Sequence, residues 1–234
     1  MPATHEILVV FDLDGTLVEA ADPDHRHAFE HALRAVYGVP ATLDGLRLGG
    51  RLDLEIAQAA LSAAGVRVDH ADERLVRVMT VMGRHYGLRV APGDRTDRLL
   101  AGVVEVLRKL RAAGIATAVG TGSATAVARA KLAAAEIADY LPVGAYGDDV
   151  VDRAELLMLA AERSAVHYRR KFLLANTVVI GDTPADIAAG RAVGARVVAV
   201  ATGRYAGDEL DEHGPDAIFT DLANADAIVK VIRS

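Results

Sequence analysis

The chain has 234 residues, of which 52% are hydrophobic and 25% are charged, enough apolar material for one large domain or for a core with a smaller insert. The net charge of −6 disfavours a general nucleic-acid-binding protein, although a small anionic substrate can still occupy a local basic pocket. Cysteine is absent, which excludes disulfides, thiolate catalysis and zinc–thiolate sites.

The N-terminus is a short polar lead that runs into an apolar segment, unlike a signal peptide. No apolar run in the sequence approaches membrane-spanning length, and neither disorder nor low complexity is indicated. We therefore expect a soluble, cytoplasmic protein with no membrane partner, either a monomer or a homodimer.

The first predicted strand covers residues 7–11, and three helical patterns without a convincing strand follow it over residues 18–95. Asp22 can cap the first helix, Pro23 fits its first position and Gly38 can end it. The second and third helices are predicted over residues 52–64 and 72–86. A helical insert at this place cannot belong to the sheet, so we expect it to lie over the C-terminal ends of the strands as a lid.

From residue 97 onward, apolar runs alternate with helical patterns in the order expected of a parallel sheet. A helix over 97–114 ends at Gly114, and a strand over 115–120 leads to a helix over 123–136. Next come an apolar run over 141–147, a helix over 152–168, a strand over 177–182, a short helix from Pro184 and a strand over 195–203. The predicted fold is a doubly wound, Rossmann-like α/β core, residues 1–17 and 96–234, with an inserted all-α cap, residues 18–95.

Two aspartates end the first strand. Side chains two residues apart in a strand face the same way, so Asp12 and Asp14 can converge on one point. Gly15 allows a sharp turn there, and Thr16 offers a hydroxyl. Carboxylates that close repel each other unless one is protonated or a cation lies between them, and Mg²⁺ suits such oxygen ligands. The alternative is a solvated Asp-Gly turn.

A second acidic pair follows the strand over 177–182. Asp182 lies at the edge of the next helix, and Asp186 lies inside its first turns. Asp182 alone could be a helix cap. Two acidic pairs at strand ends of one α/β domain instead predict three or four carboxylates around a single cation.

Hydroxyl-bearing and small residues also follow the strand over 115–120. Thr121, Gly122 and Ser123 precede a helix, and free N–H groups at a helix N-terminus bind oxyanions such as phosphate. The alternative is that Ser123 is simply the N-cap of that helix.

The stretches "DLDGT" at residues 12–16 and "GDTPAD" at 181–186 resemble the haloacid dehalogenase-like hydrolase superfamily, in its phosphoglycolate phosphatase-like branch, along essentially the whole chain. The resemblance implies that Asp12 is the nucleophile that takes up the phosphoryl group, and that Asp14 is the general acid–base. It implies Mg²⁺ ligation by the Asp12 carboxylate, the Asp14 main-chain carbonyl and Asp182, supported by Asp186. The phosphate-binding residues that it implies are Thr16, Thr121, Gly122 and Ser123.

The superfamily pattern also requires a cation, usually Lys, between the second and fourth motifs. Lys131 lies about two turns beyond Thr121, where a solvent-facing lysine is expected. Arg153, at the start of the next helix, resembles the members of the branch that have Arg in place of Lys. We therefore predict that Arg153 supplies this cation, with Lys131 as the alternative.

Residues of the cap are candidates for contact with the substrate. Gly50–Asp53 resembles a Gly-Arg-Thr-Asp stretch of phosphatase relatives, with Leu in place of Thr, and Arg51 could contact the end of the substrate that does not react. The alternative is that Asp53 caps its helix while Arg51 lies on the surface. Three further polar residues near the first hinge can face the cleft: His25, Arg26 and His27. For at least two of them, a place on an exposed helix face is expected.

Other reactions of the superfamily can be compared on the same residues. A dehalogenase of this fold lacks the second aspartate, and a phosphonate hydrolase uses a lid lysine, whereas residues 18–95 contain none. A phosphosugar mutase keeps Asp14 and stays open, although its lid features are not identified here. A non-catalytic phosphate-ligand binding protein is disfavoured by the intact Asp12, Asp14, Thr121 and Asp182. The sequence thus predicts a Mg²⁺-dependent phosphatase acting on a small, phosphoglycolate-like metabolite through an aspartyl-phosphate.

Overall fold

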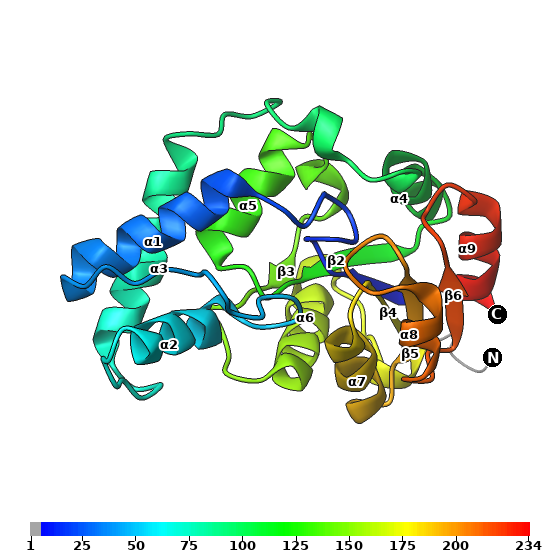
Figure 1. Ribbon diagram of the computed structural model, residues 1–234. Coiled ribbons are helices and arrows are strands. Elements are labelled where there is room, and N and C mark those ends of the chain that lie inside the picture. The colour runs from blue at the N-terminus through cyan, green and yellow to red at the C-terminus, as the bar shows by residue number, and fades with distance from the viewer. Residues whose placement is uncertain (1–5) are drawn as a thin grey trace.

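A computed structural model describes residues 6–234 of the chain, so most of the N-terminal lead, residues 1–5, lies outside the described residues. The strands of the described residues form one six-stranded sheet in the order β3-β2-β1-β4-β5-β6, and every neighbouring pair is parallel (Figure 1). The predicted doubly wound α/β fold class is confirmed. The strands are β1 Leu8–Phe11, β2 Ala116–Gly120, β3 Gly144–Ala145, β4 Thr177–Gly181, β5 Arg196–Val200 and β6 Ala217–Phe219.

Strand β1 lies in the middle of the sheet, and all four of its residues are buried. Phe11 is in register with Val119 of β2 on one side and with Ile180 of β4 on the other. The order of the strands reverses between β1 and β4, which is where doubly wound sheets bind ligands. The residues that follow these two strands, Asp12 and Asp182, therefore emerge side by side at that edge.

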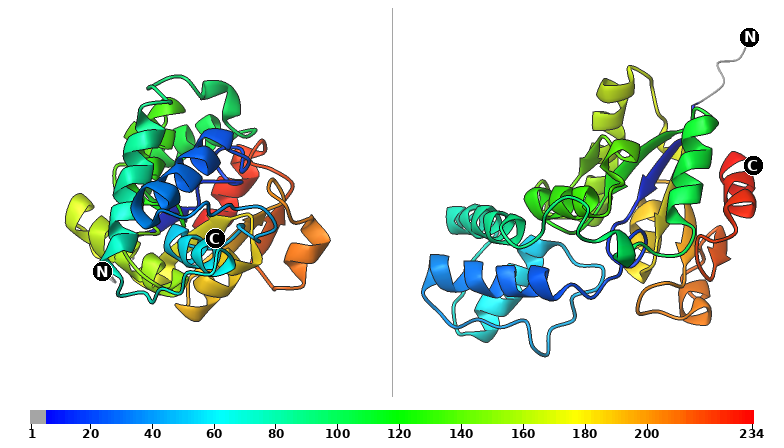
Figure 2. Two further views of the ribbon diagram at one scale, coloured as in Figure 1. Left: turned by 60° about the vertical axis from the view of Figure 1, so that its left-hand side comes forward. Right: turned by 90° about the horizontal axis from the view of Figure 1, so that it is seen from above.

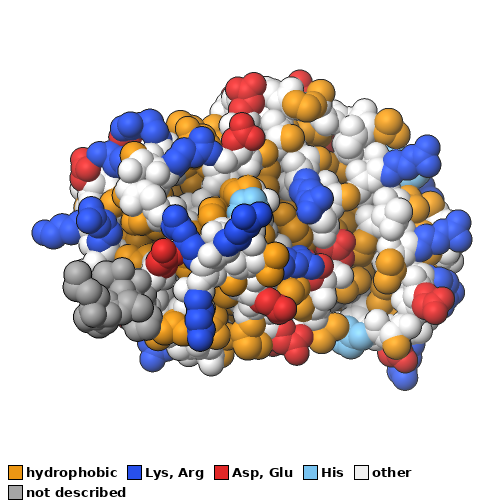
Figure 3. Space-filling model, turned by 180° about the vertical axis from the view of Figure 1, so that it is seen from behind, with side chains coloured by type: hydrophobic (Ala, Val, Ile, Leu, Met, Phe, Trp, Pro, Cys, Tyr) orange, Lys and Arg blue, Asp and Glu red, His pale blue; other side chains and the backbone are white. Residues whose placement is uncertain are grey.

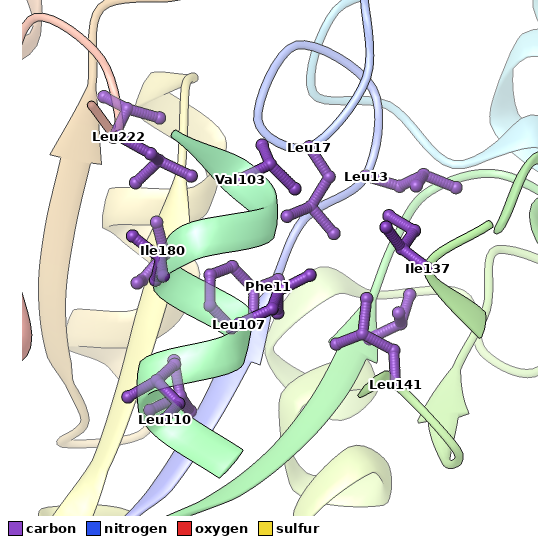
Figure 4. Packing of buried hydrophobic residues seen from close by; sticks show 14 of the residues in the cluster. Phe11, Leu13, Leu17, Val103, Leu107, Leu110, Ile137, Leu141, Ile180 and Leu222 are labelled. Carbon is purple, nitrogen blue, oxygen red and sulfur yellow. The ribbon is translucent and has the colours of Figure 1, made fainter. Parts of the chain in front are cut away.

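Helices cover both faces of the sheet, which explains why its strands are apolar on both sides. On one face, Phe11 and Ile180 pack with Leu107 of α4 (Figure 4). This face is covered by α4 Val103–Ala112, α5 Thr125–Ala134 and α9 Ala225–Arg233. The other face is covered by α6 Arg153–Tyr168, α7 Pro184–Ala192 and the short α8 Gly207–Asp211.

The chain between β1 and α4 forms the three predicted helices, α1 Pro23–Tyr37, α2 Asp53–Ala63 and α3 Glu73–Gly87. Asp22 caps α1 by accepting hydrogen bonds from two backbone N–H groups, and Gly38 ends it with a left-handed φ of 72°. The helices lie beside the sheet rather than on either face (Figure 1, and Figure 2 from above), and share a separate apolar cluster with α5. A helical lid with an apolar cluster of its own is consistent with this arrangement. The division into a core and a cap stays a prediction.

Two parts of the secondary-structure prediction differ from the structure. The helix predicted from residue 97 begins only at Val103, because Gly102 before it has a left-handed φ of 79°, which is not helical. A Cβ at Gly102 would lie 1.9 Å from the carbonyl oxygen of Leu222, so only glycine fits there. The residues after 203 had no predicted elements, whereas the structure forms α8, β6 and α9 there.

The surface carries charges of both signs. On the face opposite to Figure 1, Lys and Arg are interspersed with Asp, Glu, apolar and uncharged surface (Figure 3). Each helix of residues 6–234 is too short or too polar to cross a membrane.

Candidate active site

Three buried carboxylates meet at the edge of the sheet where β1 and β4 end. Asp12 follows β1, Asp182 follows β4, and Asp186 lies in the first turn of α7. One oxygen of each carboxylate lies within 4.8 Å of the others. The hydroxyl of Thr183 caps α7 and donates to Asp186 Oδ2 at 2.7 Å, which fixes that side chain. The acidic residues at the two strand ends are thus brought together.

The negative charges of this buried cluster repel one another, which disfavours the ionised carboxylates. Burial, followed by the nearby charge of Asp186, raises the pKa of Asp12 well above its usual value. The same two causes raise the pKa of Asp182 to about 7. A divalent cation would relieve this repulsion, and three carboxylates are the oxygen donors that a hard cation such as Mg²⁺ prefers. The donor set therefore fits a metal ion.

Arg153, the first residue of α6, is the cation in contact with this cluster. Its Nη2 lies 3.1 Å from Asp12 Oδ1 and 2.5 Å from Asp186 Oδ1. Although burial acts to lower the pKa of Arg153, the two carboxylates raise it above its ordinary value, so the guanidinium stays charged. One guanidinium bridges the predicted nucleophile and a predicted metal ligand.

Asp14 has different partners from Asp12. Its Oδ1 accepts a hydrogen bond from Lys131 Nζ at 2.6 Å, and its Oδ2 accepts one from Ser123 Oγ at 2.8 Å. Its side chain is 24% exposed, compared with 8% for Asp12. The two aspartates of the "DLDGT" stretch therefore lie in unequal surroundings, each next to its own cation.

The expectation that Lys131 faces solvent is wrong. Its side chain is 4% exposed, because it lies on the same face of α5 as the buried Val127 and Ala128, one turn earlier. This spacing was present in the sequence, but a lysine on an apolar helix face is more often explained by its long side chain reaching water. Both candidate cations consequently lie in the site, Arg153 beside Asp12 and Lys131 beside Asp14.

The loop after β2 is buried against the site. Ser123 N donates to Thr121 Oγ1 at 3.2 Å, which curls the loop on itself. The alternative role of Ser123 as N-cap is wrong, because the N-cap of α5 is Ala124 and the Ser123 hydroxyl binds Asp14 instead. Thr16 also lies in the site, where its hydroxyl donates to Asp182 Oδ1 at 3.1 Å.

Asp53 joins the predicted cap to this loop. Its backbone N–H donates to Gly122 O at 2.8 Å, and its carboxylate accepts the N–H of Ala124 at 2.7 Å. Asp53 does not cap its own helix, whose N-cap is Leu52. The Arg51 side chain is exposed, while its backbone lies so close to Gly122 that a Cβ there would be 2.3 Å from Arg51 O.

The polar group at the first hinge divides as follows. His25 reaches the site: its Nδ1 lies 3.1 Å from Lys131 Nζ, and its Nε2 lies 3.3 Å from Asp53 Oδ2, without hydrogen-bond geometry. Arg26 forms an ion pair with Asp44 at 2.6 Å outside the cleft, and the His27 side chain is exposed. One of the three therefore belongs to the site.

A loop after β5 also borders the site, and no motif in the sequence marks it. Thr202 Oγ1 donates to Gly15 O at 2.5 Å. A Cβ at Gly203 would lie 1.7 Å from Asp182 Oδ2, and one at Gly15 would lie 2.4 Å from the same atom. Two glycines therefore make room for the Asp182 carboxylate.

Comparisons with known proteins agree with this geometry. The family model described as haloacid dehalogenase-like hydrolase matches residues 8–194. The phosphoglycolate phosphatase of Yersinia pseudotuberculosis is 29% identical, covering 92% of this chain and 90% of that protein. The probable phosphatase IndB of Dickeya dadantii is 31% identical, covering 97% and 96%.

Solved structures show the same fold. A hydrolase from Pseudomonas syringae aligns with a TM-score of 0.67 at 22% identity, covering 98% of this chain and all of that one. A β-phosphoglucomutase from Clostridium difficile aligns with a TM-score of 0.69 at 18% identity, covering 98% of each chain. At these identities the likeness concerns the fold alone.

Proposed function

We propose that this chain, which belongs to the haloacid dehalogenase-like hydrolase family and is a phosphatase, depends on Mg²⁺. Its proposed substrate is a small, phosphoglycolate-like phosphomonoester. The observation that carries the proposal is the position of Asp12. It contacts Arg153 and lies in a cluster with two further buried carboxylates, at the point where the strand order reverses. The relatives named as phosphoglycolate phosphatases support the substrate class.

Asp12 is proposed as the nucleophile. Its oxygen forms a bond to phosphorus while the bond from phosphorus to the alcohol oxygen breaks, which leaves an aspartyl-phosphate. Asp12 must be ionised to attack, and Arg153, 3.1 Å away, favours the ionised form. A bound Mg²⁺, held by Asp12, Asp182, Asp186 and the main-chain carbonyl of Asp14, would neutralise charge on the phosphoryl oxygens.

Asp14 is proposed as the general acid–base. It gives a proton to the alcohol oxygen as that group leaves, and then takes a proton from the water that attacks the aspartyl-phosphate. Inorganic phosphate leaves, and Asp12 and Asp14 return to their starting states. The unequal surroundings support this division, because Asp14 is the more exposed of the two and is hydrogen-bonded to residues outside the carboxylate cluster.

The loop of Thr121, Gly122 and Ser123 is proposed to bind the phosphoryl oxygens, since it is buried and borders Asp14. Arg153 adds a charged donor on the side of Asp12. Because the Thr16 hydroxyl is bound to Asp182, we propose that Thr16 orients this metal ligand; its predicted contact with phosphate stays a prediction.

The experiment is a hydrolysis assay with p-nitrophenyl phosphate and with a panel of phosphorylated metabolites, with Mg²⁺ or with EDTA. We expect hydrolysis with Mg²⁺, little with EDTA, and 2-phosphoglycolate among the substrates. Absence of activity above an Asp12→Asn control would contradict the proposal and favour a binding protein. Conversion of a sugar 1-phosphate to its 6-phosphate would favour the mutase.

A further inference from the structure

Lys131 is a buried cation that the proposed reaction does not use. Its Nζ donates to Asp14 Oδ1 at 2.6 Å and lies 3.1 Å from His25 Nδ1. An ammonium group carries three protons, and each needs an acceptor when the group is buried. Residues 6–234 supply two acceptors for Lys131, so its third proton is available to a ligand.

The position of Lys131 relates it to the alcohol part of the substrate. Asp14 must lie within hydrogen-bond distance of the alcohol oxygen that it protonates. Lys131 contacts the same carboxylate, whereas Arg153 contacts Asp12 on the phosphoryl side. A group one or two carbons beyond the alcohol oxygen is thus within reach of Lys131.

A small hollow lies beside Lys131, and each of the three cations at it is paired with a carboxylate. The hollow has a volume of about 10 Å³, room for about one water molecule, and three cations and two carboxylates line it. Arg95, one of these cations, has a buried Nε without a hydrogen-bond partner among the described residues. The hollow is lined by Val18, Glu19, Asp22, Tyr86, Arg95, Arg98 and Lys131.

The cap holds Lys131 in this position. His25 belongs to α1, and its Nδ1 can accept from Lys131 only when that nitrogen carries no proton. The proton of the neutral ring is then on Nε2, which lies 3.3 Å from the carboxylate of Asp53. His25 and Asp14 together restrict the direction of the remaining Lys131 proton.

We propose that Lys131 determines specificity by binding a carboxylate on the alcohol part of the substrate. The protein would then prefer phosphate esters of short hydroxy acids over esters of neutral alcohols of the same length and over phosphosugars. This inference rests on the proposed phosphatase reaction, and it adds the residue that recognises the organic part of the substrate.

The test compares kcat/KM for 2-phosphoglycolate and for 2-hydroxyethyl phosphate, which has a neutral hydroxymethyl group in place of the carboxylate. We expect the wild-type protein to prefer 2-phosphoglycolate. Lys131→Met should reduce this preference by about 10- to 100-fold, the effect of losing a hydrogen bond between charged groups. Lys131→Arg should keep most of the preference, because it retains a cation.

The ratio of the two kcat/KM values is the readout, because removing a partner of Asp14 should slow both reactions. Lys109→Met is the control, since Lys109 pairs with Asp226 in an exposed ion pair and its loss changes the net charge equally. It should leave the ratio unchanged. Thermal unfolding of each variant shows whether it is folded.

A wild-type ratio near one would overturn the inference, whether or not the variants fold. So would an unchanged ratio in folded Lys131→Met. If Lys131→Met does not fold, competitive inhibition of the wild-type protein decides: glycolate should inhibit at lower concentration than ethylene glycol, and equal inhibition would overturn the inference. If the protein hydrolyses neither of the two esters and does not hydrolyse p-nitrophenyl phosphate, the proposed function is contradicted instead.

Discussion

Asp53, in the predicted cap, accepts a hydrogen bond from the backbone N–H of Ala124, at the start of α5, at a distance of 2.7 Å. Asp53 is 3% exposed, and its own N–H donates to Gly122 of the proposed phosphate loop. The predicted cap therefore contacts the candidate site through the loop that would bind phosphate. Opening of the cap would break both bonds and leave the N–H of Ala124 without this partner.

From this contact we predict that Asp53→Ala weakens phosphate binding. A hydrogen bond to a charged group contributes about 1.5–3 kcal/mol, so KM and the inhibition constant of inorganic phosphate should rise by about tenfold or more. Asp53→Asn keeps an oxygen acceptor for Ala124 N–H and should recover most of the loss. Steady-state kinetics with phosphate as inhibitor measures this.

Asp44→Ala is the matched control, because Asp44 is also in the chain segment of the cap but its side chain is 79% exposed. It should leave KM unchanged. If Asp53→Ala is folded and has the wild-type inhibition constant for phosphate, the loop does not depend on Asp53.

Arg153 should affect both turnover and stability. Among residues 6–234 it is the one cation paired with Asp12 and Asp186, so Arg153→Met leaves buried carboxylates without that partner. We expect kcat to fall by about 10²- to 10³-fold, and the free energy of unfolding in EDTA to fall by about 3–5 kcal/mol. Arg153→Lys should retain part of the turnover and part of the stability, because it keeps the positive charge. It should not retain all of either, because an ammonium group cannot reproduce the two-pronged hydrogen bonding of the guanidinium.

Addition of Mg²⁺ should restore part of the stability of Arg153→Met, since the metal ion would take over the neutralisation of the same carboxylates. Urea unfolding with EDTA and with Mg²⁺ measures this. Equal losses of stability in both conditions would show that the carboxylates do not share a metal ion.

The metal-free protein should become less stable as the pH rises. The pKa of Asp182 is about 7 in the folded protein, above the ordinary value of 3.8, mainly because burial disfavours its charge. The folded state therefore binds this proton more tightly, so the contribution to stability is present below the ordinary value and is lost as pH rises through the folded pKa. Asp182→Asn should reduce this dependence and leave the part that the raised pKa of Asp12 contributes.

Mg²⁺ should correspondingly stabilise the wild-type protein more at about pH 8 than at about pH 5, because it competes with protons for the carboxylates. Thermal unfolding with EDTA and with Mg²⁺ at the two pH values measures the shift. An equal shift at both would contradict a site made of carboxylates with raised pKa values.

Gly203→Ala should disturb the proposed metal site although it substitutes none of the proposed ligands. The added Cβ would lie 1.7 Å from Asp182 Oδ2, so the carboxylate must move. We expect the Mg²⁺ concentration for half-maximal activity to rise by about 10- to 100-fold, as for other changes next to metal ligands. Gly207→Ala, a few residues later, is the control, because its Cβ would meet only Ile218 at 3.9 Å. Equal Mg²⁺ requirements in both variants would mean that Asp182 is not a ligand.

The sheet and the acidic residues were predictable because the signals were local. The apolar run before Asp12 marks a strand buried on both sides, and parallel strands end at one edge, which brings Asp12 and Asp182 together. Asp22 and Gly38 marked the ends of the first helix for the same local reason. The family resemblance, carried by the same motifs, is confirmed.

What was missed depends on contacts between distant segments. Neither Lys131 nor His25 has a motif around it, and their meeting requires α5 and α1 to pack beside Asp14. Asp53 looked like a local cap but serves the helix that begins 72 positions later in the chain, at Thr125. Gly203 is necessary only because Asp182 lies next to it in space.

The most direct test of the central claim, that Asp12 takes up the phosphoryl group, is to quench the reaction with acid and locate that group by peptide mass spectrometry. Wild-type protein and Asp12→Asn are compared, with turnover and thermal unfolding measured in parallel. The account predicts a phosphoryl group on Asp12 of the wild-type protein, and a folded variant with neither label nor turnover. Full turnover by folded Asp12→Asn would contradict it.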